Sequence, residues 1–423
     1  MNELENKLDD YVSKTYGAEF KFRKYQKETI LDICEIFFEG KKSLYLLSAP
    51  VGSGKSIIAM IVSSFLATFG KSGYILTSNL ALQTQYENDL KNYRLEFGSI
   101  KGVDNYLCSV NNEKFSIGDC RSRDISYNKA EQLDCFAVCG YFSARRKAIS
   151  SRVSLLNYSY FLIQRNYVGM MIEARGQQAP FERRDFTICD EAHNLAEIVQ
   201  GHFSPRVDHA MLPRLEKIIQ VLTDNKVSIP SSTIADVKIC IDRLFKEEDN
   251  SMLIDLLVEL RDHIKEFVRC TDRVRVKISS LYGKDQLIPS YWIHVLTLLD
   301  WCKDAHCKLD DYCKIIENSG VKSMIKNLQE KQVTFNCIDE SYLMNKHFHE
   351  QCNFKLMMTA TMGDHKDFMR TIGSTSSHYR KMESSFNYGR SPIILYPKRK
   401  MSREHIDKTI PWAAVEVSKL LSR

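Results

Sequence analysis

Short apolar runs are the first pattern along the chain. Each has four or five residues, the length and character of a buried parallel strand. They lie at 44–47, 74–77, 153–156, 186–189 and 354–358. Residues 56–69, between the first two runs, have the pattern of a crossover helix. This alternation predicts an α/β domain built on a parallel sheet.

A helical pattern occupies the middle of the chain, from about 200 to 330. Apolar residues recur there at helical spacing, with charged residues on the opposite faces. The two clearest stripes are Leu215, Ile218, Ile219 and Leu222, and Leu253, Leu256, Leu257 and Leu260. Residues 332–343 are expected to be extended. Residues 103–143 contain four cysteines and little periodicity, so we expect a sheet domain interrupted twice.

Composition excludes few classes of function. The net charge of +6 over 423 residues permits a polyanionic partner without requiring one. The thirteen cysteines are an odd number, and the N-terminus has no signal-peptide pattern, so a reducing, cytoplasmic location is expected. The longest strongly apolar stretch, 57–69, is too short to span a bilayer, and no membrane partner is expected.

A candidate phosphate-binding loop follows the first strand and precedes the first crossover helix. Its residues are Ala49, Pro50, Val51, Gly52, Ser53, Gly54, Lys55 and Ser56. The two glycines let backbone N–H groups surround phosphate oxygens at a helix N-terminus. Lys55 is expected to reach the β- and γ-phosphates of ATP, and the Ser56 hydroxyl to bind Mg²⁺. A Gly-Ser turn ahead of an ordinary helix is the structural alternative.

Two adjacent acids follow the strand at 186–189. Because parallel strands end at the edge where phosphates bind, Asp190 and Glu191 are expected to face the loop. We assign Asp190 to the magnesium side and Glu191 to the general base. His193 is a poor magnesium ligand, since Mg²⁺ prefers oxygen, and is expected to couple nucleotide to nucleic acid.

Four cysteines, Cys108, Cys120, Cys135 and Cys139, are separated by eleven, fourteen and three residues. Four thiolates suit either an iron–sulfur cluster or tetrahedral zinc, and ordinary buried cysteines are the alternative. A second group, Cys302, His306, Cys307 and Cys313, lies in a helical pattern and is expected to be packing rather than a metal site.

Together, the loop and Asp190-Glu191-Ala192-His193 resemble motifs I and II of superfamily 2 helicases, in the branch of the XPD/DinG iron–sulfur helicases. Further segments resemble that family's motifs in the same order. They are Phe22–Gln26, Leu76–Asn79, Asn105–Cys108, Cys139–Phe142, Asn157–Tyr160, Thr359–Met362 and Glu383–Phe386. The resemblance extends from about residue 20 to 390 and is weak in the helical segment.

This resemblance implies a P-loop RecA-like parallel sheet interrupted by a Cys-rich iron–sulfur insert and a helical arch. It places Arg23 and Gln26 near the adenine of ATP, and Ser78, Asn79, Thr359 and Thr361 at the DNA or in coupling. It favours a 4Fe-4S cluster over zinc on the four cysteines. The implied function is an ATP- and Mg²⁺-dependent helicase that moves 5′ to 3′ on single-stranded or forked DNA.

The same resemblance also predicts the domain boundaries of the chain. The motor domain is expected at 1–102, 144–200 and 346–390, the cluster insert at 103–143, the arch at 201–345, and a linker with the start of a second motor domain at 391–423. Motifs IV to VI and the arginine finger of the family have no room after Pro392.

Two other functions stay open. One is a DNA-binding nucleotide switch, or a subunit that needs a second chain for the other motor domain. The other is a P-loop kinase or transporter ATPase, against which the Leu76–Asn79 segment and the four-cysteine insert argue.

Overall fold

The computed structural model describes residues 2–118, 133–169, 178–282, 290–319, 324–329 and 331–383, with 410–412, 414–415 and 418–419 near the end. The chain divides into two compact units, 1–383 and 384–423. In the second unit the described residues are helical. All the elements below belong to the first unit.

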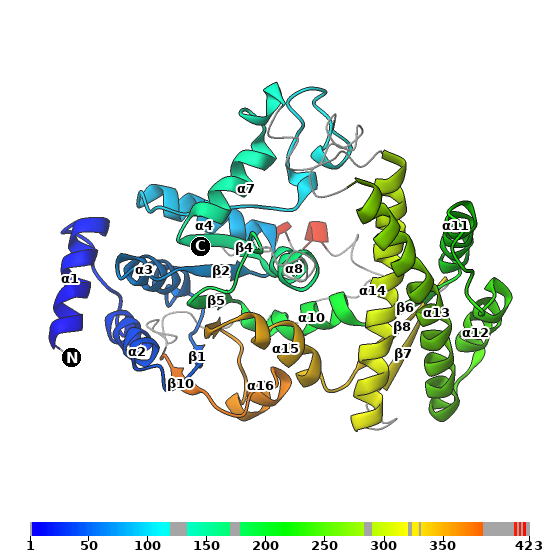
Figure 1. Ribbon diagram of the computed structural model, residues 1–423. Coiled ribbons are helices and arrows are strands. Elements are labelled where there is room, and N and C mark those ends of the chain that lie inside the picture. The colour runs from blue at the N-terminus through cyan, green and yellow to red at the C-terminus, as the bar shows by residue number, and fades with distance from the viewer. Residues whose placement is uncertain are drawn as a thin grey trace. The chain divides into compact units, whose positions relative to one another are not determined.

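A parallel sheet forms the centre of the first unit (Figure 1). Its seven described strands follow the order β10-β1-β9-β5-β2-β4-β3, and every neighbouring pair is parallel. They are β1 (Leu44–Ser48), β2 (Gly73–Thr77), β3 (Gly98–Ser99), β4 (Val153–Asn157), β5 (Phe186–Asp190), β9 (Phe354–Thr359) and β10 (His378–Lys381). The five strands predicted from apolar runs are confirmed, and the RecA-like α/β class with them.

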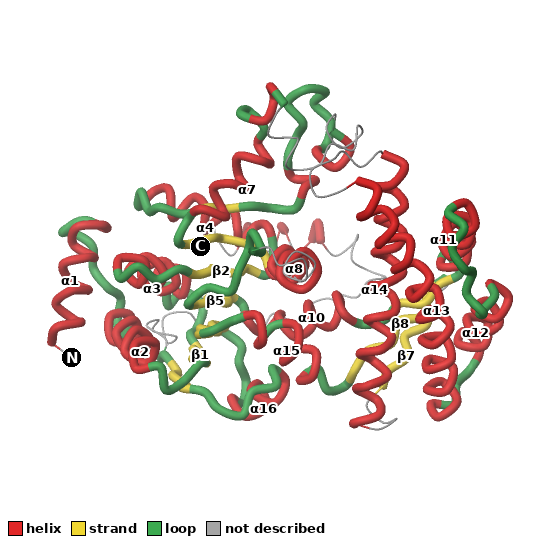
Figure 2. The backbone as a smooth tube through the Cα atoms, viewed as in Figure 1, coloured by secondary structure: helices red, strands yellow, loops and turns green. Residues whose placement is uncertain are grey.

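Helices pack on both faces of the sheet (Figure 2). They are α1 (Asn2–Tyr16), α2 (Gln26–Glu39), α3 (Lys55–Thr68), α4 (Leu80–Asn92), α7 (Gly140–Ser150), α8 (Tyr158–Ile163), α10 (Leu195–Phe203), α15 (Ser341–His347) and α16 (His365–Thr371). Short helical turns lie at Val103–Asn105, Phe115–Ile117, Asp134–Phe136, Gln164–Gly169, Ala192–Asn194 and His349–Gln351.

Alternation along each strand produces two apolar cores, because successive side chains point to opposite faces. Tyr45 and Leu47 of β1 pack in the core that α1 to α4 cover. Leu44 and Leu46 pack in the core that includes Leu195 of α10. This second core continues into the helical segment.

The segment predicted as a helical arch, 201–345, contains helices α11 (Met211–Asp224), α12 (Ile234–Lys246), α13 (Asn250–Tyr282) and α14 (Ser290–Ser319). It also contains strands, one of them in the stretch expected to be extended. An antiparallel sheet lies within it, in the order β6-β8-β7. Its strands are β6 (Arg206–Asp208), β7 (Met324–Gln329) and β8 (Gln332–Cys337). The extended stretch expected at 332–343 ends at Cys337, since α15 begins at Ser341.

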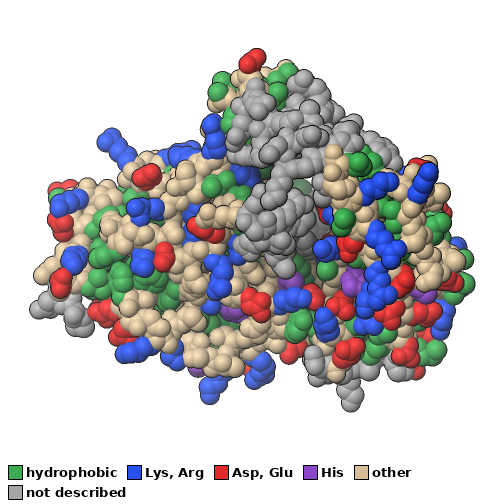
Figure 3. Space-filling view, in the orientation of Figure 1, with side chains coloured by type: hydrophobic (Ala, Val, Ile, Leu, Met, Phe, Trp, Pro, Cys, Tyr) green, Lys and Arg blue, Asp and Glu red, His purple; other side chains and the backbone are tan. Residues whose placement is uncertain are grey.

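Charges of both signs intermingle on the helical segment, at the right of Figure 3. Many belong to ion pairs, such as Lys238–Asp242 at 2.6 Å and Arg275–Asp300 at 2.6 Å. No helix in the described ranges is both long and apolar enough to cross a bilayer.

Candidate nucleotide-binding and catalytic site

The predicted phosphate loop joins β1 to α3. Gly52 and Gly54 have φ values of 79° and 82°, in the left-handed region that favours glycine. A Cβ on Gly54 would lie 2.2 Å from Gln26 Nε2, so the Gln26 side chain would have to move to accommodate it. Helix α3 begins at Lys55, which leaves its first N–H groups free to meet an anion. The strand–loop–helix context expected of a P-loop is present.

The buried Ser53 hydroxyl gives a further sign of a polar ligand. Ser53 is 5% exposed, and its Oγ has no hydrogen-bond partner among the described residues. A buried polar atom without a partner is costly, so such atoms in native proteins usually meet a ligand, an ion or water. A phosphate oxygen is one ligand atom that could form a hydrogen bond with the Ser53 hydroxyl.

Arg23 and Gln26 brace the loop from the start of α2. Gln26 Nε2 donates to Ser53 O at 2.9 Å, and Gln26 Oε1 accepts from Arg23 N at 2.7 Å. The Arg23 guanidinium donates to Gly52 O. Both residues predicted near the adenine thus contact the phosphate-loop backbone, and their position relative to a base stays a prediction.

Asp190 and Glu191 emerge at the carboxyl end of β5, as expected. Glu191 N donates to Asp190 Oδ1 at 3.0 Å. Lys55 Nζ lies 3.8 Å from Glu191 Oε1 and donates to Ala49 O at 3.4 Å. The structure therefore brings the loop lysine and the acid pair together, although 135 positions separate Lys55 from Asp190.

Burial governs the electrostatics of Asp190. Its removal from water raises the pKa of the carboxyl group, and the charge of Glu191 raises it further. A hydrogen bond from Tyr86 and the charge of Lys55 act in the opposite direction. A divalent cation beside this carboxylate would favour its ionised form in the same way as Lys55 does.

His193 and Thr359 connect the acid pair with β9. His193 Nδ1 lies 2.8 Å from Thr359 Oγ1 and 3.3 Å from Glu191 Oε2. Thr361 N donates to Thr359 Oγ1 at 3.1 Å. Three residues predicted to couple nucleotide to DNA therefore form one hydrogen-bonded group that lies beside the predicted base.

Ser78 and Asn79 lie between β2 and α4. Asn79 is exposed and caps α4, since its Oδ1 accepts from Leu82 N at 3.0 Å. Asn79 Nδ2 lies 3.4 Å from Ser78 Oγ. Among the described residues no hydrogen bond or ion pair joins them to the acid pair, and their role at the DNA stays a prediction.

Two tyrosines at Asp190 were not predicted from the sequence. Tyr86 donates its hydroxyl to Asp190 Oδ2 at 2.9 Å, and Tyr158 donates to Asp190 O at 2.8 Å. Tyr86 lies outside the segments that resemble family motifs, and Tyr158 lies in the Asn157–Tyr160 segment without a role assigned to it. The one available signal was the helical spacing that places Tyr86 two turns after Asn79.

The structure describes three of the four predicted cluster ligands. Cys108 and Cys139 are buried and Cys135 is half-buried, whereas Cys120 lies outside the described residues. Within the described ranges, no group of three or more Cys, His, Asp or Glu side chains is arranged to hold a metal. The cluster therefore stays a prediction.

The segments on either side of the four-cysteine insert pack against each other. The rings of Phe115 and Tyr141 stack at 4.3 Å, and Phe115 N donates to Tyr106 O at 2.8 Å. A Cβ on Gly118 would lie 3.1 Å from Cys108 Sγ. The first and last parts of this insert thus share one small apolar core.

The second cysteine group lies on α14. Cys302 and Cys313 are buried in the core of the helical segment, and Cys307 is exposed. Burial raises the pKa of the Cys302 thiol to about 12 and that of Cys313 to about 11.

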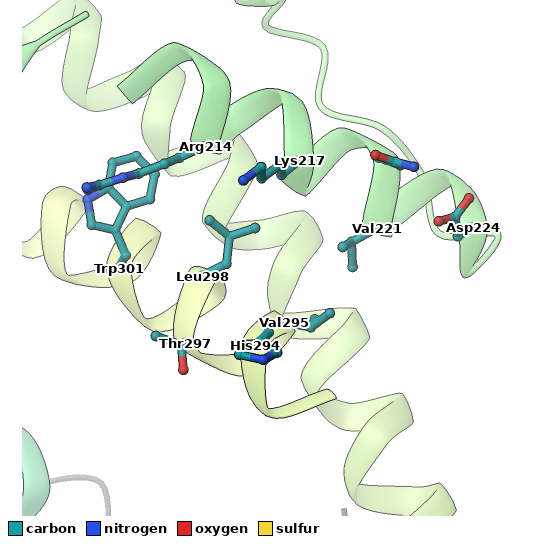
Figure 4. Close-up of a pocket in the computed structure, with 10 residues that line it drawn as sticks. Arg214, Lys217, Val221, Asp224, His294, Val295, Thr297, Leu298 and Trp301 are labelled. Atoms are coloured by element: carbon teal, nitrogen blue, oxygen red, sulfur yellow. The ribbon is translucent and has the colours of Figure 1, made fainter. Parts of the chain in front are cut away.

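A groove is present away from this site, in the described part of the helical segment. It lies between α11 and α14, has a volume of about 800 Å³, and is lined by residues such as Lys217, Val221 and Leu298 (Figure 4). At one end the Arg214 guanidinium lies 5.0 Å from the centre of the Trp301 ring. No predicted site residue lines this groove.

Comparisons with known proteins give a consistent set of relatives. The family described as "Type III restriction enzyme, res subunit" matches residues 19–227. A protein of Methanocaldococcus jannaschii described as a probable ATP-dependent helicase is 26% identical over 204 residues, which are 43% of this chain and 30% of that protein.

Solved structures of XPD proteins cover most of the chain at low identity. An XPD helicase is 14% identical with a TM-score of 0.44, over 85% of this chain and 62% of that one. Xpd4 of S. tokodaii is 15% identical with a TM-score of 0.44, over 86% and 61%. The chain thus spans less than two thirds of these relatives. The family match and the Methanocaldococcus jannaschii relative support the predicted resemblance to ATP-dependent helicases.

Proposed function

We propose that the chain is the ATP-binding motor part of a DNA helicase. The observation that carries this proposal is the meeting of the P-loop with the acid pair, with Lys55 Nζ 3.8 Å from Glu191 Oε1. Lys55 would bind the β- and γ-phosphates of ATP, and Ser56 and Asp190 would hold Mg²⁺. Magnesium supplies charge neutralisation at the transferred phosphoryl group.

The remaining residues would act on water and on coupling. Glu191 would orient the attacking water and accept its proton. His193 and Thr359, hydrogen-bonded to each other at 2.8 Å, would report occupancy of the nucleotide site to Ser78, Asn79 and Thr361 at the DNA. Support comes from the motif order and from the relative described as a probable ATP-dependent helicase.

ATP hydrolysis with and without single-stranded DNA tests this proposal. We expect Mg²⁺-dependent hydrolysis that DNA stimulates, and loss of both basal and stimulated rates in Lys55→Ala. Glu216→Ala on α11, far from the loop in sequence and outside the site, is the control. A rate that DNA does not change would favour the nucleotide-switch alternative, and a rate unaffected by Lys55→Ala would contradict the proposal.

Movement from 5′ to 3′ and the 4Fe-4S cluster form the finer part of the proposal. The ligands would be Cys108, Cys120, Cys135 and Cys139. Iron–sulfur clusters are bound by cysteine thiolates. The packing of Phe115 against Tyr141 would hold the two sides of the insert together. A second motor domain, on a further chain or further sequence, would supply the arginine finger.

A further inference from the structure

Tyr86 is buried at the point where α4 passes the acid pair. The residue is 1% exposed, and its hydroxyl donates to Asp190 Oδ2 at 2.9 Å. The other carboxylate oxygen, Oδ1, accepts from Glu191 N at 3.0 Å. Two donors, one on each oxygen, fix both the position and the plane of this carboxylate.

The ring of Tyr86 packs in the apolar core that α1 to α4 cover, and this packing holds the hydroxyl at Asp190.

Helix α4 holds this hydroxyl firmly. One turn before Tyr86, the buried Gln83 donates from Nε2 to Ile100 O at 3.0 Å and to Ser99 Oγ at 3.0 Å. Asn79 caps the same helix at its start. Tyr86 follows Asn79 by seven residues, roughly 10 Å along the helix axis. Helix α4 therefore begins beside Asn79, which is predicted to contact DNA, and about two turns later it brings Tyr86 to Asp190, the predicted magnesium ligand.

We infer that Tyr86 is a positioning residue for the divalent cation of the nucleotide site. It does not bind the cation itself. It orients the Asp190 carboxylate through the hydrogen bond to Oδ2. This inference rests on the proposed function and adds a residue that the motifs do not contain. Partners of this kind commonly change metal affinity or activity by about 10- to 100-fold when they are removed.

The test compares nucleotide binding at varied Mg²⁺ in Tyr86→Phe and the parent chain, by titration of a fluorescent ATP analogue. Tyr86→Phe keeps the buried ring and removes the hydroxyl. We expect the Mg²⁺ midpoint to rise about 10-fold or more. Binding measured in EDTA should not change, because the Lys55 and backbone contacts with phosphate remain. A purely structural role would weaken both kinds of binding together.

Tyr74→Phe is the matched control, since Tyr74 is equally buried and donates to Glu182 O at 2.8 Å, away from the acid pair. Tyr86→Leu is a second variant that lacks the hydroxyl. For every variant we also measure how much Mg²⁺ raises the melting temperature, relative to the same variant without Mg²⁺. An unchanged midpoint in either folded Tyr86 variant overturns the inference.

Lys55→Ala separates this inference from the proposed function. If Lys55→Ala abolishes nucleotide binding and Tyr86→Phe leaves the Mg²⁺ midpoint unchanged, only the role of Tyr86 is wrong. If Lys55→Ala leaves nucleotide binding unchanged, the nucleotide site itself is wrong, and the inference is overturned with it.

Discussion

Asp190 and Glu191 are neighbours in sequence, yet their carboxylates have different surroundings. Asp190 is 3% exposed and accepts two hydrogen bonds, one on each oxygen. Glu191 is half-buried, has a φ of 51°, and faces Lys55 and His193. A fixed carboxylate suits a metal ligand, and a more accessible one suits a base that must meet water.

This difference predicts separate effects of substitution. Glu191→Gln should leave Mg²⁺–ATP affinity within a few fold and lower the rate of hydrolysis by about 10²-fold or more. Single-turnover hydrolysis together with nucleotide titration measures both quantities. Glu197→Gln, an exposed acid on α10, is the control. A Glu191→Gln variant that keeps the parent rate would show that another group activates the water.

Among individual residues, the site residues that directly follow a strand could be predicted from the sequence. Contacts between residues that are far apart in the sequence could not. The loop glycines, Lys55 and the acid pair each follow a strand, so the edge of a parallel sheet brings them together. Tyr86 reaches Asp190 across 104 positions, and its neighbours in sequence carry no sign of that contact. The hydrogen bonds of Arg23 and Gln26 to the loop backbone were hidden for the same reason.

Among the elements, the central strands were predictable because they are buried on both faces and therefore form continuous apolar runs. β6 has three residues, and β7 and β8 follow a long helical pattern with mixed polarity. β8 alternates buried and half-buried residues, and it was expected to continue to residue 343. Its end at Cys337 depends on pairing with β6 and β7, which no local pattern reports.

The turn from β1 into α3 gives a prediction about stability. Gly54→Ala places a Cβ in a left-handed conformation and against Gln26, whereas Gly40→Ala meets the left-handed cost alone, with nothing within 4 Å. The backbone cost is about 1–2 kcal/mol in each case. Thermal melting should therefore show a larger loss of stability for Gly54→Ala. Equal melting temperatures would contradict the steric argument.

The four-cysteine insert gives a second prediction at this scale. Protein purified without oxygen should be brown and contain about four iron and four sulfide per chain if the cubane assembles. Cys135→Ser should lose the colour, and the buried Cys302→Ser should keep it. Metal analysis that finds one zinc and no iron would favour the zinc alternative instead.

Over the whole molecule, the net charge of +6 and the proposed movement on single-stranded DNA predict binding through phosphates rather than bases. Affinity for single-stranded DNA should therefore fall with salt, with a log–log slope of about −0.7 for each phosphate contact. Fluorescence anisotropy with two unrelated sequences, at several salt concentrations, measures this. Salt-independent affinity, or a strong preference for one sequence, would contradict binding of this kind.

The central claim is that the loop and the acid pair form one ATP site, and calorimetric titration of a non-hydrolysable ATP analogue tests it most directly. The parent chain should bind the analogue with one site per chain and more tightly with Mg²⁺ than without. Lys55→Ala should lose this binding while its melting temperature stays close to that of the parent. Unchanged affinity in a folded Lys55→Ala variant would contradict the account.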